Sequence, residues 1–309
     1  MSELSARPLR PHLRLGLYLS FNTLTVLGAL WFAPPTVELI LVALASYYVR
    51  MFAVTAVYHR LFAHRSYTPR DRVVQFVLAL WALTSAQRGP IWWATTHRWH
   101  HRHADTPLDL HSPSQQGLWE SHILWVFTHR ANPTYQPPPP TDLLRFPELV
   151  WLDRLDILGP VGLGALLYAL GGLPYVLWGL GVATVLLWHG SSSINSLGHT
   201  WGDQAYDTGD QSRNNLWLLP VTLGENWHNN HHAYPGAARH GHKPGEWDPT
   251  GALITLWWRL GLVTRMNPGP SGAAHPARSG SDVRAEGAAP PPPLGSDVVN
   301  RDGDGDVHP

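Results

Sequence analysis

The fold is decided by the stretch LGLYLSFNTLTVLGALWFAPPTVELILVALASYYVRMFAVTAV, residues 15–57. It contains two apolar runs, 15–33 and 37–57, which are separated by a Pro-Pro pair, and the second run is interrupted by Arg50. Each run is about 20 residues long, which is enough to cross the hydrocarbon core of a bilayer as an α-helix. Because the prolines favour a tight turn between the runs, the stretch predicts a transmembrane hairpin.

A second apolar pair follows later in the chain, at residues 157–171 and 174–193, and GGLP separates its two arms. The first of these arms is short, but the pair predicts a second hairpin and therefore four transmembrane helices. The apolar segment at 72–86 is too short for an easy crossing, so we expect an interfacial or buried helix there. The fold class predicted from these runs is an all-α integral membrane protein.

The segments outside the hairpins are polar, and their charges predict the orientation. Two hairpins place the N-terminal segment 1–14, the middle of the chain and its C-terminal part on the same side of the membrane. Seven arginines fall on that side: Arg7, Arg10, Arg14, Arg60, Arg65, Arg70 and Arg72. The positive-inside rule makes this side cytoplasmic. The tail 269–309 is rich in Gly, Ala, Pro, Ser and Asp, and it is predicted to be disordered.

Composition narrows the possible functions. The formal net charge is +0 with histidine neutral, so no basic field indicates a nucleic-acid partner. The charged fraction is only 14% and there are 16 tryptophans, which favours a protein in contact with lipid. The chain has no cysteine, which excludes disulfides, thiolate metal sites and cysteine nucleophiles. It has 19 histidines, and imidazole is the commonest side chain that binds zinc, copper and iron.

Nine of the histidines fall in four clusters, three of which lie at the ends of predicted membrane helices or soon after them. The clusters are HRLFAH at 59–64, HRWHH at 97–101, NSLGH at 195–199 and HNNHH at 228–232. On a helix, residues three and four apart share a face, so each HxxHH cluster can direct histidines at two adjacent sites. Nine imidazoles exceed the ligand number of one metal, and neutral nitrogen ligands favour iron over zinc or copper. Six other histidines are expected to be surface or capping residues: His12, His129, His240, His242, His275 and His308.

The clusters HRLFAH, HRWHH and HNNHH match the motifs HxxxxH, HxxHH and HxxHH of the membrane fatty acid desaturases. Four longer stretches resemble signatures of the bacterial stearoyl-CoA (acyl-CoA Δ9) desaturases: GPIWWATTHRWHHRHADTPLDLHSP, NSLGHTWG, YDTGDQSRNN and TLGENWHNNHHAYP. The resemblance covers residues 15–268. It implies a membrane domain of four transmembrane helices under a cytosolic helical cap that holds a histidine-rich di-iron site.

The resemblance also implies a ligand set and a reaction. The residues that would hold two iron ions are His59, His64, His97, His100, His101, His199, His228, His231 and His232, with Asn195 joining through water. The implied enzyme uses O2 to introduce a cis double bond, at Δ9, into a saturated acyl-CoA or another acyl carrier such as a lipid. Electrons would come from a separate ferredoxin, flavodoxin or cytochrome b5-like donor, because the HPGG motif of a fused cytochrome b5 is absent. The implied location is a bacterial inner membrane, with the active site and both termini cytoplasmic.

Other residues are candidates for supporting roles. Side chains that could orient the imidazoles are Asp105, Asp109, Glu225, Asn226 and Asn229. Those that could line a substrate tunnel are Gln87, Trp92 and Trp93, and those that could bind a CoA phosphate or lipid headgroups are Arg60, Arg65, Arg98 and Arg102. Three residues depart from the pattern usual in the family: Thr95, Thr96 and Asn226.

Three alternative functions share some of these features. A lipid or alkane hydroxylase uses similar histidine-rich di-iron chemistry, and histidine spacing alone separates it poorly from a desaturase. A divalent-metal transporter with cytosolic histidine loops predicts ionisable residues inside several spans, but Arg50 and His189 are the only ones well within the predicted spans, with Glu38 at the very start of its span. A haem-binding membrane subunit needs histidine pairs within the spans, whereas these clusters lie outside them.

Overall fold

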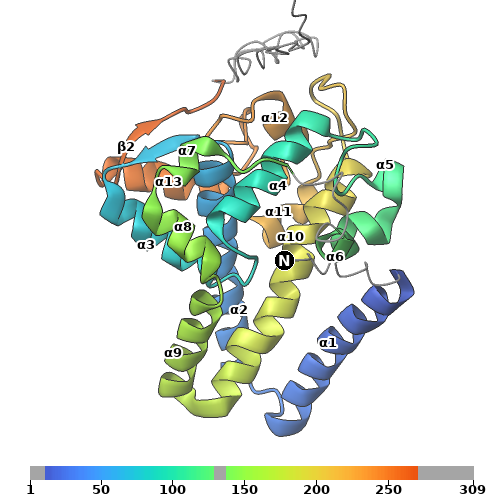
Figure 1. Ribbon diagram of the computed structural model, residues 1–309, viewed down its shortest axis with the longest axis vertical. Helices are drawn as coiled ribbons and strands as arrows, with labels where there is room; N and C mark the ends of the chain where they lie inside the picture. The colour runs from blue at the N-terminus through green and yellow to red at the C-terminus, as the bar shows by residue number, and fades with distance from the viewer. Residues whose placement is uncertain (1–10, 129–136, 271–309) are drawn as a thin grey trace, which may run out of the picture.

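The computed structural model describes residues 11–128 and 137–270, and this part of the chain is mostly helical (Figure 1). Long helices extend from one side of a layer of shorter elements. The long helices are α1 (Pro11–Phe32), α2 (Val37–Phe52), α9 (Leu158–Tyr175) and α10 (Ala183–Ser196). The predicted disordered tail lies outside the described residues from 271 onward.

Three helical stretches are long and apolar enough to cross a membrane: Leu15–Phe32, Val37–Ala63 and Leu158–His199. These stretches indicate that the protein associates with a membrane. The second stretch continues from α2 directly into the π-helix η1 (Ala53–Ala63), so it ends at Ala63 rather than at the predicted residue 57. The helix extends further because the polar side chains of His59 and Arg60 find partners in the protein interior.

The third stretch is kinked where the sequence has GGLP. Gly171 and Gly172 have non-helical backbone angles, and Gly172 adopts a φ of +66°, which glycine tolerates without steric cost. After this kink the chain continues through η5 (Val176–Val182) into α10. Figure 1 shows that it turns here, so that α9 and α10 run in opposite directions.

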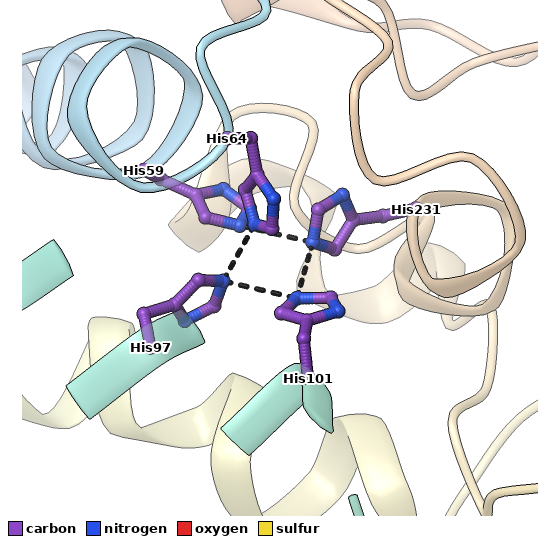
Figure 2. Close-up of side chains that lie close together, drawn as sticks. All are labelled: His59, His64, His97, His101 and His231. Atoms are coloured by element: carbon purple, nitrogen blue, oxygen red, sulfur yellow. Dashed lines mark hydrogen bonds between the residues drawn. The ribbon is translucent and has the colours of Figure 1, made fainter. Parts of the chain in front are cut away.

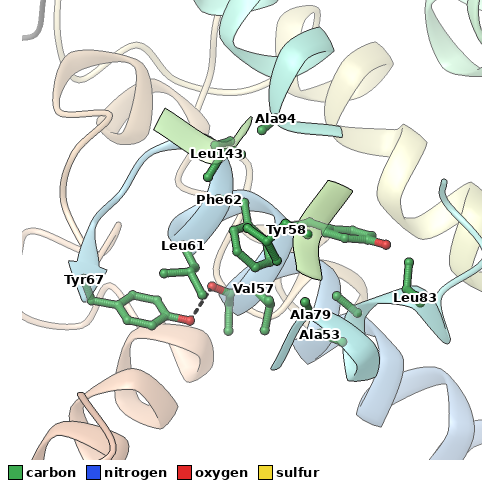
Figure 3. Close-up of a cluster of buried hydrophobic side chains, with 14 of the residues drawn as sticks. Ala53, Val57, Tyr58, Leu61, Phe62, Tyr67, Ala79, Leu83, Ala94 and Leu143 are labelled. Carbon is green, nitrogen blue, oxygen red and sulfur yellow. Dashed lines mark hydrogen bonds between the residues drawn. The ribbon is translucent and has the colours of Figure 1, made fainter. Parts of the chain in front are cut away.

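The π-helix η1 passes through the centre of the layer, and all of its residues are buried. Its apolar side chains, among them Val57, Tyr58 and Phe62, form one core with side chains of the surrounding helices (Figure 3). The surrounding helices are α3 (Arg72–Leu83), α4 (Pro90–His103), α8 (Pro147–Arg154) and α13 (Pro249–Arg259). The Tyr67 hydroxyl donates a hydrogen bond of 2.9 Å to the carbonyl of Ala56 across this core. The core therefore fixes η1 on several sides.

The prediction of an all-α fold misses a small antiparallel sheet. Its strands are β1 (Tyr67–Pro69) and β2 (Val263–Met266), and Tyr67 pairs with Met266. The sheet joins the segment that follows η1 to the end of the described chain. The remaining short elements are α5 (Pro113–Gln116), η2 (Glu120–Leu124), α6 (Trp125–Thr128), α7 (Thr141–Leu144), η6 (Leu197–His199), η7 (Leu216–Leu218), α11 (Leu219–Thr222) and α12 (His228–Ala233).

Arg50, the charged residue inside the second apolar run, is 1% exposed. Its Nε donates to the carbonyl of Thr84 at 2.8 Å, and its Nη2 donates to the hydroxyl of Thr184 at 2.6 Å. The guanidinium thus links α2 to the end of α3 and to α10. These hydrogen bonds offset part of the cost of placing a cation at this depth.

The contact between α3 and α9 gives a test of the fold. A Cβ added at Gly159 would lie 2.3 Å from the backbone carbon of Leu83, whereas a Cβ at Gly162 would meet nothing within 4 Å. Gly159→Ala should therefore destabilise the protein by about 1–3 kcal/mol, as overpacking does, and lower its thermal unfolding midpoint in detergent. Gly162→Ala on the same helix is the matched control, and alanine's helix propensity should leave its midpoint unchanged or slightly raised. Equal midpoints for the two variants would contradict this packing.

Candidate metal centre

A first group of five histidines directs ring nitrogens at one point (Figure 2). Its members are His59, His64, His97, His101 and His231. The distance between Nε2 atoms is 3.0 Å for His59 and His231, 2.8 Å for His64 and His97, and 2.9 Å for His101 and His231. These side chains come from η1 and its C-terminal end, from α4 and from α12, so the group joins three segments that are distant in the sequence.

A second group lies beside the first and contains His100, His199, His228 and His232, all of them buried. The Nε2 atoms of His199 and His228 are 2.9 Å apart. Helix α4 gives His97 and His101 to the first group and His100 to the second. Helix α12 similarly gives His231 to the first group and His228 and His232 to the second. The i, i+3, i+4 spacing of HRWHH and HNNHH therefore serves two adjacent sites. Together the two groups include all nine histidines of the four sequence clusters.

The π-helix explains how His59 and His64 reach the same site. Residues five apart on an α-helix point about 140° away from each other. The wider turn of a π-helix, with hydrogen bonds from residue i+5 to residue i, brings such residues onto one face. The amide of His64 donates to the carbonyl of His59 at 3.1 Å, which is a bond of this kind. The HxxxxH spacing therefore requires the local π-helical winding.

Four of the nine imidazoles have Nδ1 next to a buried carboxylate. The distances are 2.6 Å from His59 to Glu225, 2.9 Å from His100 to Asp109, 2.8 Å from His199 to Asp105, and 2.7 Å from His232 to Asp210. A carboxylate at Nδ1 holds the proton on that nitrogen and leaves the lone pair of Nε2 directed into the group. This is the tautomer that a metal ligand requires.

The electrostatics favour the neutral form for most of these rings; at His100, burial lowers the pKa, but the charge and hydrogen bond of Asp109 outweigh it and raise the pKa. Burial, followed by the effect of neighbouring histidines, holds the pKa of His64, His97, His101, His228 and His231 well below its ordinary value. Burial alone would raise the pKa of Asp105, but the hydrogen bond and charge of His199 outweigh it and bring that pKa down to about 2. The centre therefore combines neutral nitrogen donors with ionised carboxylates behind them.

The arrangement fits metal ions. The Nε2 atoms of His100 and His232 are buried and have no hydrogen-bond partner in the described structure. Within each group one nitrogen of every ring lies within 4.8 Å of the others. Unprotonated nitrogens crowded in this way repel each other, and a cation at each centre removes that cost. Two adjacent cations would satisfy both groups.

Four residues near the centre, all with largely buried side chains, were not recognised from the sequence. Asp210 lies in YDTGDQSRNN, far from any histidine cluster, and its contact with His232 could not be foreseen from spacing. His111 stacks on His100 with ring centres 4.3 Å apart. The prediction that His240 and His242 are surface or capping residues is wrong, because their exposed fractions are 0% and 7%. The Nδ1 of His240 lies 3.2 Å from Oε2 of Glu225, so one carboxylate contacts two imidazoles.

The asparagines have different surroundings. Asn195 is half-buried and, together with His97, lines a cavity beside the histidine groups. The carbonyl of the Asn229 side chain accepts hydrogen bonds from the amides of Ala205 and Tyr206, both at 2.7 Å, so it holds the loop that leads to Asp210. The side chain of Asn226 is buried without a hydrogen-bond partner in the described part of the chain. Asn229 therefore supports the imidazole of His232 indirectly, through the loop that carries Asp210.

The candidate arginines differ in exposure. Arg60 is 0% exposed, and its guanidinium donates to Glu225 at 3.0 Å and to Asp248 at 2.8 Å, so it is not available to bind a phosphate. Arg98 is engaged by the carbonyls of Phe62 and Ala63 and by Asp142. Arg65 and Arg102 are exposed to solvent. The expectation that Arg60 faces a ligand is wrong, because two buried carboxylates surround it.

A cavity of about 500 Å³ leads to the centre, and its wall includes His97. Gln87, Trp92 and Trp93 all line it, as does Asn195. Trp93 stacks on the ring of His97 with centres 4.9 Å apart, and Trp92 stacks on Trp125 at 6.0 Å. The volume is within the range of small-ligand sites, and the aromatic lining suits an apolar ligand.

Comparison of the sequence with those of known proteins identifies its family. The model of the fatty acid desaturase family matches residues 13–244. The sn-2 palmitoyl-lipid 9-desaturase of Nostoc sp. (strain 36) is 42% identical over 71% of this chain and 78% of its own length. The acyl-CoA 5-desaturase AL21 of Anemone leveillei is 40% identical over 69% of this chain and 67% of its own. The sn-1 stearoyl-lipid 9-desaturase of Anabaena variabilis is 38% identical over 73% and 82%. The protein therefore belongs to the fatty acid desaturase family.

Proposed function

We propose that the protein is an O2-dependent di-iron desaturase that introduces a cis double bond at the Δ9 position of a saturated fatty acyl chain. The observation that carries this proposal is the pair of adjacent histidine groups at the wall of an apolar cavity. Two of the relatives are named as 9-desaturases, which supports the Δ9 position, although another is named as a 5-desaturase.

The two histidine groups would each hold one iron ion, and Asn195 would join through water. Bound ferrous ions supply electrons to O2 and the oxidising power that removal of hydrogen from an unactivated methylene pair requires. The balanced reaction consumes O2, two electrons and two protons, and it releases the alkene and two waters. The electrons would come from a separate ferredoxin, flavodoxin or cytochrome b5-like protein.

The chain's own residues would position the substrate and the ligands. Glu225, Asp105, Asp109 and Asp210 hold the proton on Nδ1 of their imidazoles, which keeps the ring orientations fixed. Trp93 and Gln87 are joined by a hydrogen bond of 3.3 Å and would direct an acyl chain past His97. Fixed walls of this kind select one carbon pair for reaction.

In the proposed topology the third apolar stretch crosses the membrane twice, with its turn at Gly171 and Gly172. The shorter helices and the metal centre would then form a cap on the cytoplasmic side of a bacterial inner membrane. Residues 15–268 would constitute the desaturase domain, preceded by the cytosolic segment 1–14. The antiparallel course of α9 and α10 in Figure 1 supports this topology.

The function is tested by producing the chain in a host that lacks its own desaturase. Gas chromatography of the host's fatty acids, with double-bond location by derivatisation, should reveal a new C16 or C18 monounsaturated acid with its double bond at Δ9. The matched control is the same host producing His97→Ala. A hydroxylated product instead of an alkene would replace the proposal by a hydroxylase, and a double bond at another position would refute the Δ9 assignment.

The two-ion arrangement predicts separate effects for the two groups. His231→Ala removes a ring from the first group and His228→Ala removes one from the second, so each should lower the iron content from about two ions toward one per chain and abolish activity. His103→Ala is the control, because His103 follows HRWHH on α4 but belongs to neither group. Iron is measured by mass spectrometry of the purified protein. Full iron content and wild-type turnover in both ligand variants would exclude the di-iron assignment.

Asp210 should matter through His232 rather than through the substrate. Asp210→Asn keeps the shape but loses the negative charge that holds the Nδ1 proton of His232, and changes of this kind typically cost about 10–100-fold in metal affinity or activity. The measurements are iron retention against a chelator and the absorption spectrum of the iron-loaded protein. Asp207→Asn, on the same loop and without a contact to a metal-group histidine, should leave both unchanged. Unaltered retention in Asp210→Asn would show that the contact is dispensable.

A further inference from the structure

A chain of polar side chains crosses the apolar region between α1, α10 and η2. The Tyr18 hydroxyl lies 3.0 Å from Nε2 of His189, Nδ1 of His189 lies 3.0 Å from Nε2 of His122, and Nδ1 of His122 lies 2.8 Å from the hydroxyl of Ser196. None of these residues belongs to the histidine groups of the metal centre. Ionisable residues in membrane-spanning helices are costly and usually functional, so this chain requires an explanation.

Helix α1 is attached unevenly to the rest of the molecule. Its C-terminal end packs closely: Ala29 and Ala33 form a buried cluster with Trp178, whose indole donates to the carbonyl of Ala33 at 2.8 Å. Toward its N-terminal end, Figure 1 shows α1 diverging from α10. Only 17% of the residues in the most apolar part of α1 are buried inside the protein, compared with 50% for the second membrane-length stretch. In its N-terminal half, the buried contacts of α1 are centred on Tyr18, which is 3% exposed.

Two specific side-chain contacts between that half of α1 and α10 stand out among the described residues, beside apolar packing around Tyr18 and Trp188. One is the hydrogen bond between Tyr18 and His189, and the other is the stacking of Phe21 on Trp188, whose ring centres are 5.7 Å apart. Tyr18 also packs against Ile123 of η2. We call the Tyr18–His189 hydrogen bond and the Phe21–Trp188 stack together the latch.

The cavity that reaches the metal centre lies directly behind the latch. Tyr18 and Trp188 are part of the same cavity wall as His97. On its outer side α1 is apolar, with Leu17 55% exposed and Leu24 69% exposed, which is the surface of a helix that faces lipid. An opening at the latch would therefore lie on the side of the molecule where α1 exposes its apolar surface.

We propose that the acyl chain of a membrane glycerolipid enters the cavity sideways, between α1 and α10, when the latch opens. This inference rests on the proposed desaturase function and names the carrier of its substrate. The occupant is a glycerolipid because lipid acyl chains are what the opening faces. The alternative carrier, CoA, bears several phosphate groups, whereas Arg88 is the one arginine or lysine among the described residues of the cavity wall. That guanidinium lies over the ring of Trp92, 5.6 Å from its centre.

Because the sequence contains no cysteine, two introduced cysteines can be cross-linked selectively, and such a cross-link, here called a clamp, tests the entry route. In Phe21→Cys/Trp188→Cys, a short bifunctional methanethiosulfonate reagent would fix α1 to α10 at the latch, and a reductant would release it. The control pair is Thr25→Cys/Gly181→Cys, where a Cβ at Gly181 would lie 3.2 Å from Cγ2 of Thr25, further along α1. The probe is phosphatidylcholine with a diazirine-bearing stearoyl chain, in phosphatidylcholine vesicles that contain the iron-loaded protein.

The readout is photolabelling of cavity peptides by mass spectrometry, which does not depend on turnover. The latch clamp should lower labelling by the lipid probe at least about tenfold, reductant should restore it, and the control clamp should leave it unchanged. Undiminished lipid labelling with the latch clamped would overturn the entry route. Labelling by a diazirine stearoyl-CoA but not by the lipid would overturn the carrier. Labelling as expected without any desaturation would support the entry route and count against the proposed function.

A second variant tests the latch without removing its rings. Tyr18→Phe deletes the hydroxyl that bonds to His189, so the opening should become more frequent and the rate of lipid labelling should rise about twofold to tenfold, the factor that corresponds to one hydrogen bond. Tyr168→Phe on α9, where the side chain is 64% exposed, is the control and should not change the rate. Equal labelling rates in Tyr18→Phe and the wild-type protein would show that the hydrogen bond does not hold the cavity closed.

Discussion

The structure depends on the contact between buried carboxylates and the outer nitrogens of buried histidines. Crowded imidazoles would otherwise rotate or donate protons to one another, and their lone pairs would not converge. Asp109 and His100 are both almost completely buried, so their 2.9 Å contact is little screened by water. Each such contact fixes a tautomer and a ring plane together. The contacts also come from different segments, so the centre forms only when α4, α12 and the loop at 203–214 are all in place.

Glu225 extends this constraint into the scaffold. Its Oε2 contacts His59, while its Oε1 accepts from the guanidinium of Arg60. Arg60 in turn binds Asp248, whose side chain accepts from the amide of Gly251 in the first turn of α13. Arg60 is the shared cation of two buried carboxylates, so removing its guanidinium would leave both negative charges without this partner. Helix α13, which packs on the core, is thus linked through Asp248 and Arg60 to Glu225, the residue that contacts His59.

The sequence predicts those parts of the protein that follow from local periodicity. The apolar runs predict the long helices, and the spacing in HRWHH and HNNHH predicts that α4 and α12 each serve two sites. The remaining features depend on contacts between distant segments. HRLFAH requires a π-helix that no spacing rule specifies, and Asp210 reaches His232 from a loop with no histidine in it. Arg60 resembles a surface arginine in the sequence because a pair of carboxylates 165 and 188 residues away determines its burial.

The same physical terms distinguish the metal centre from the contact between α1 and α10. Around the centre, buried charges and hydrogen bonds lock each side chain to several segments, and local opening there would expose all of them at once. Between the N-terminal half of α1 and α10, the contacts include one ring stack, one hydrogen bond and a small apolar cluster around Tyr18. A metal centre needs fixed ligands, whereas the proposed entry of an acyl chain needs a wall that yields. The uneven packing of α1 places the yielding wall next to the cavity without loosening the histidines that line its inner end.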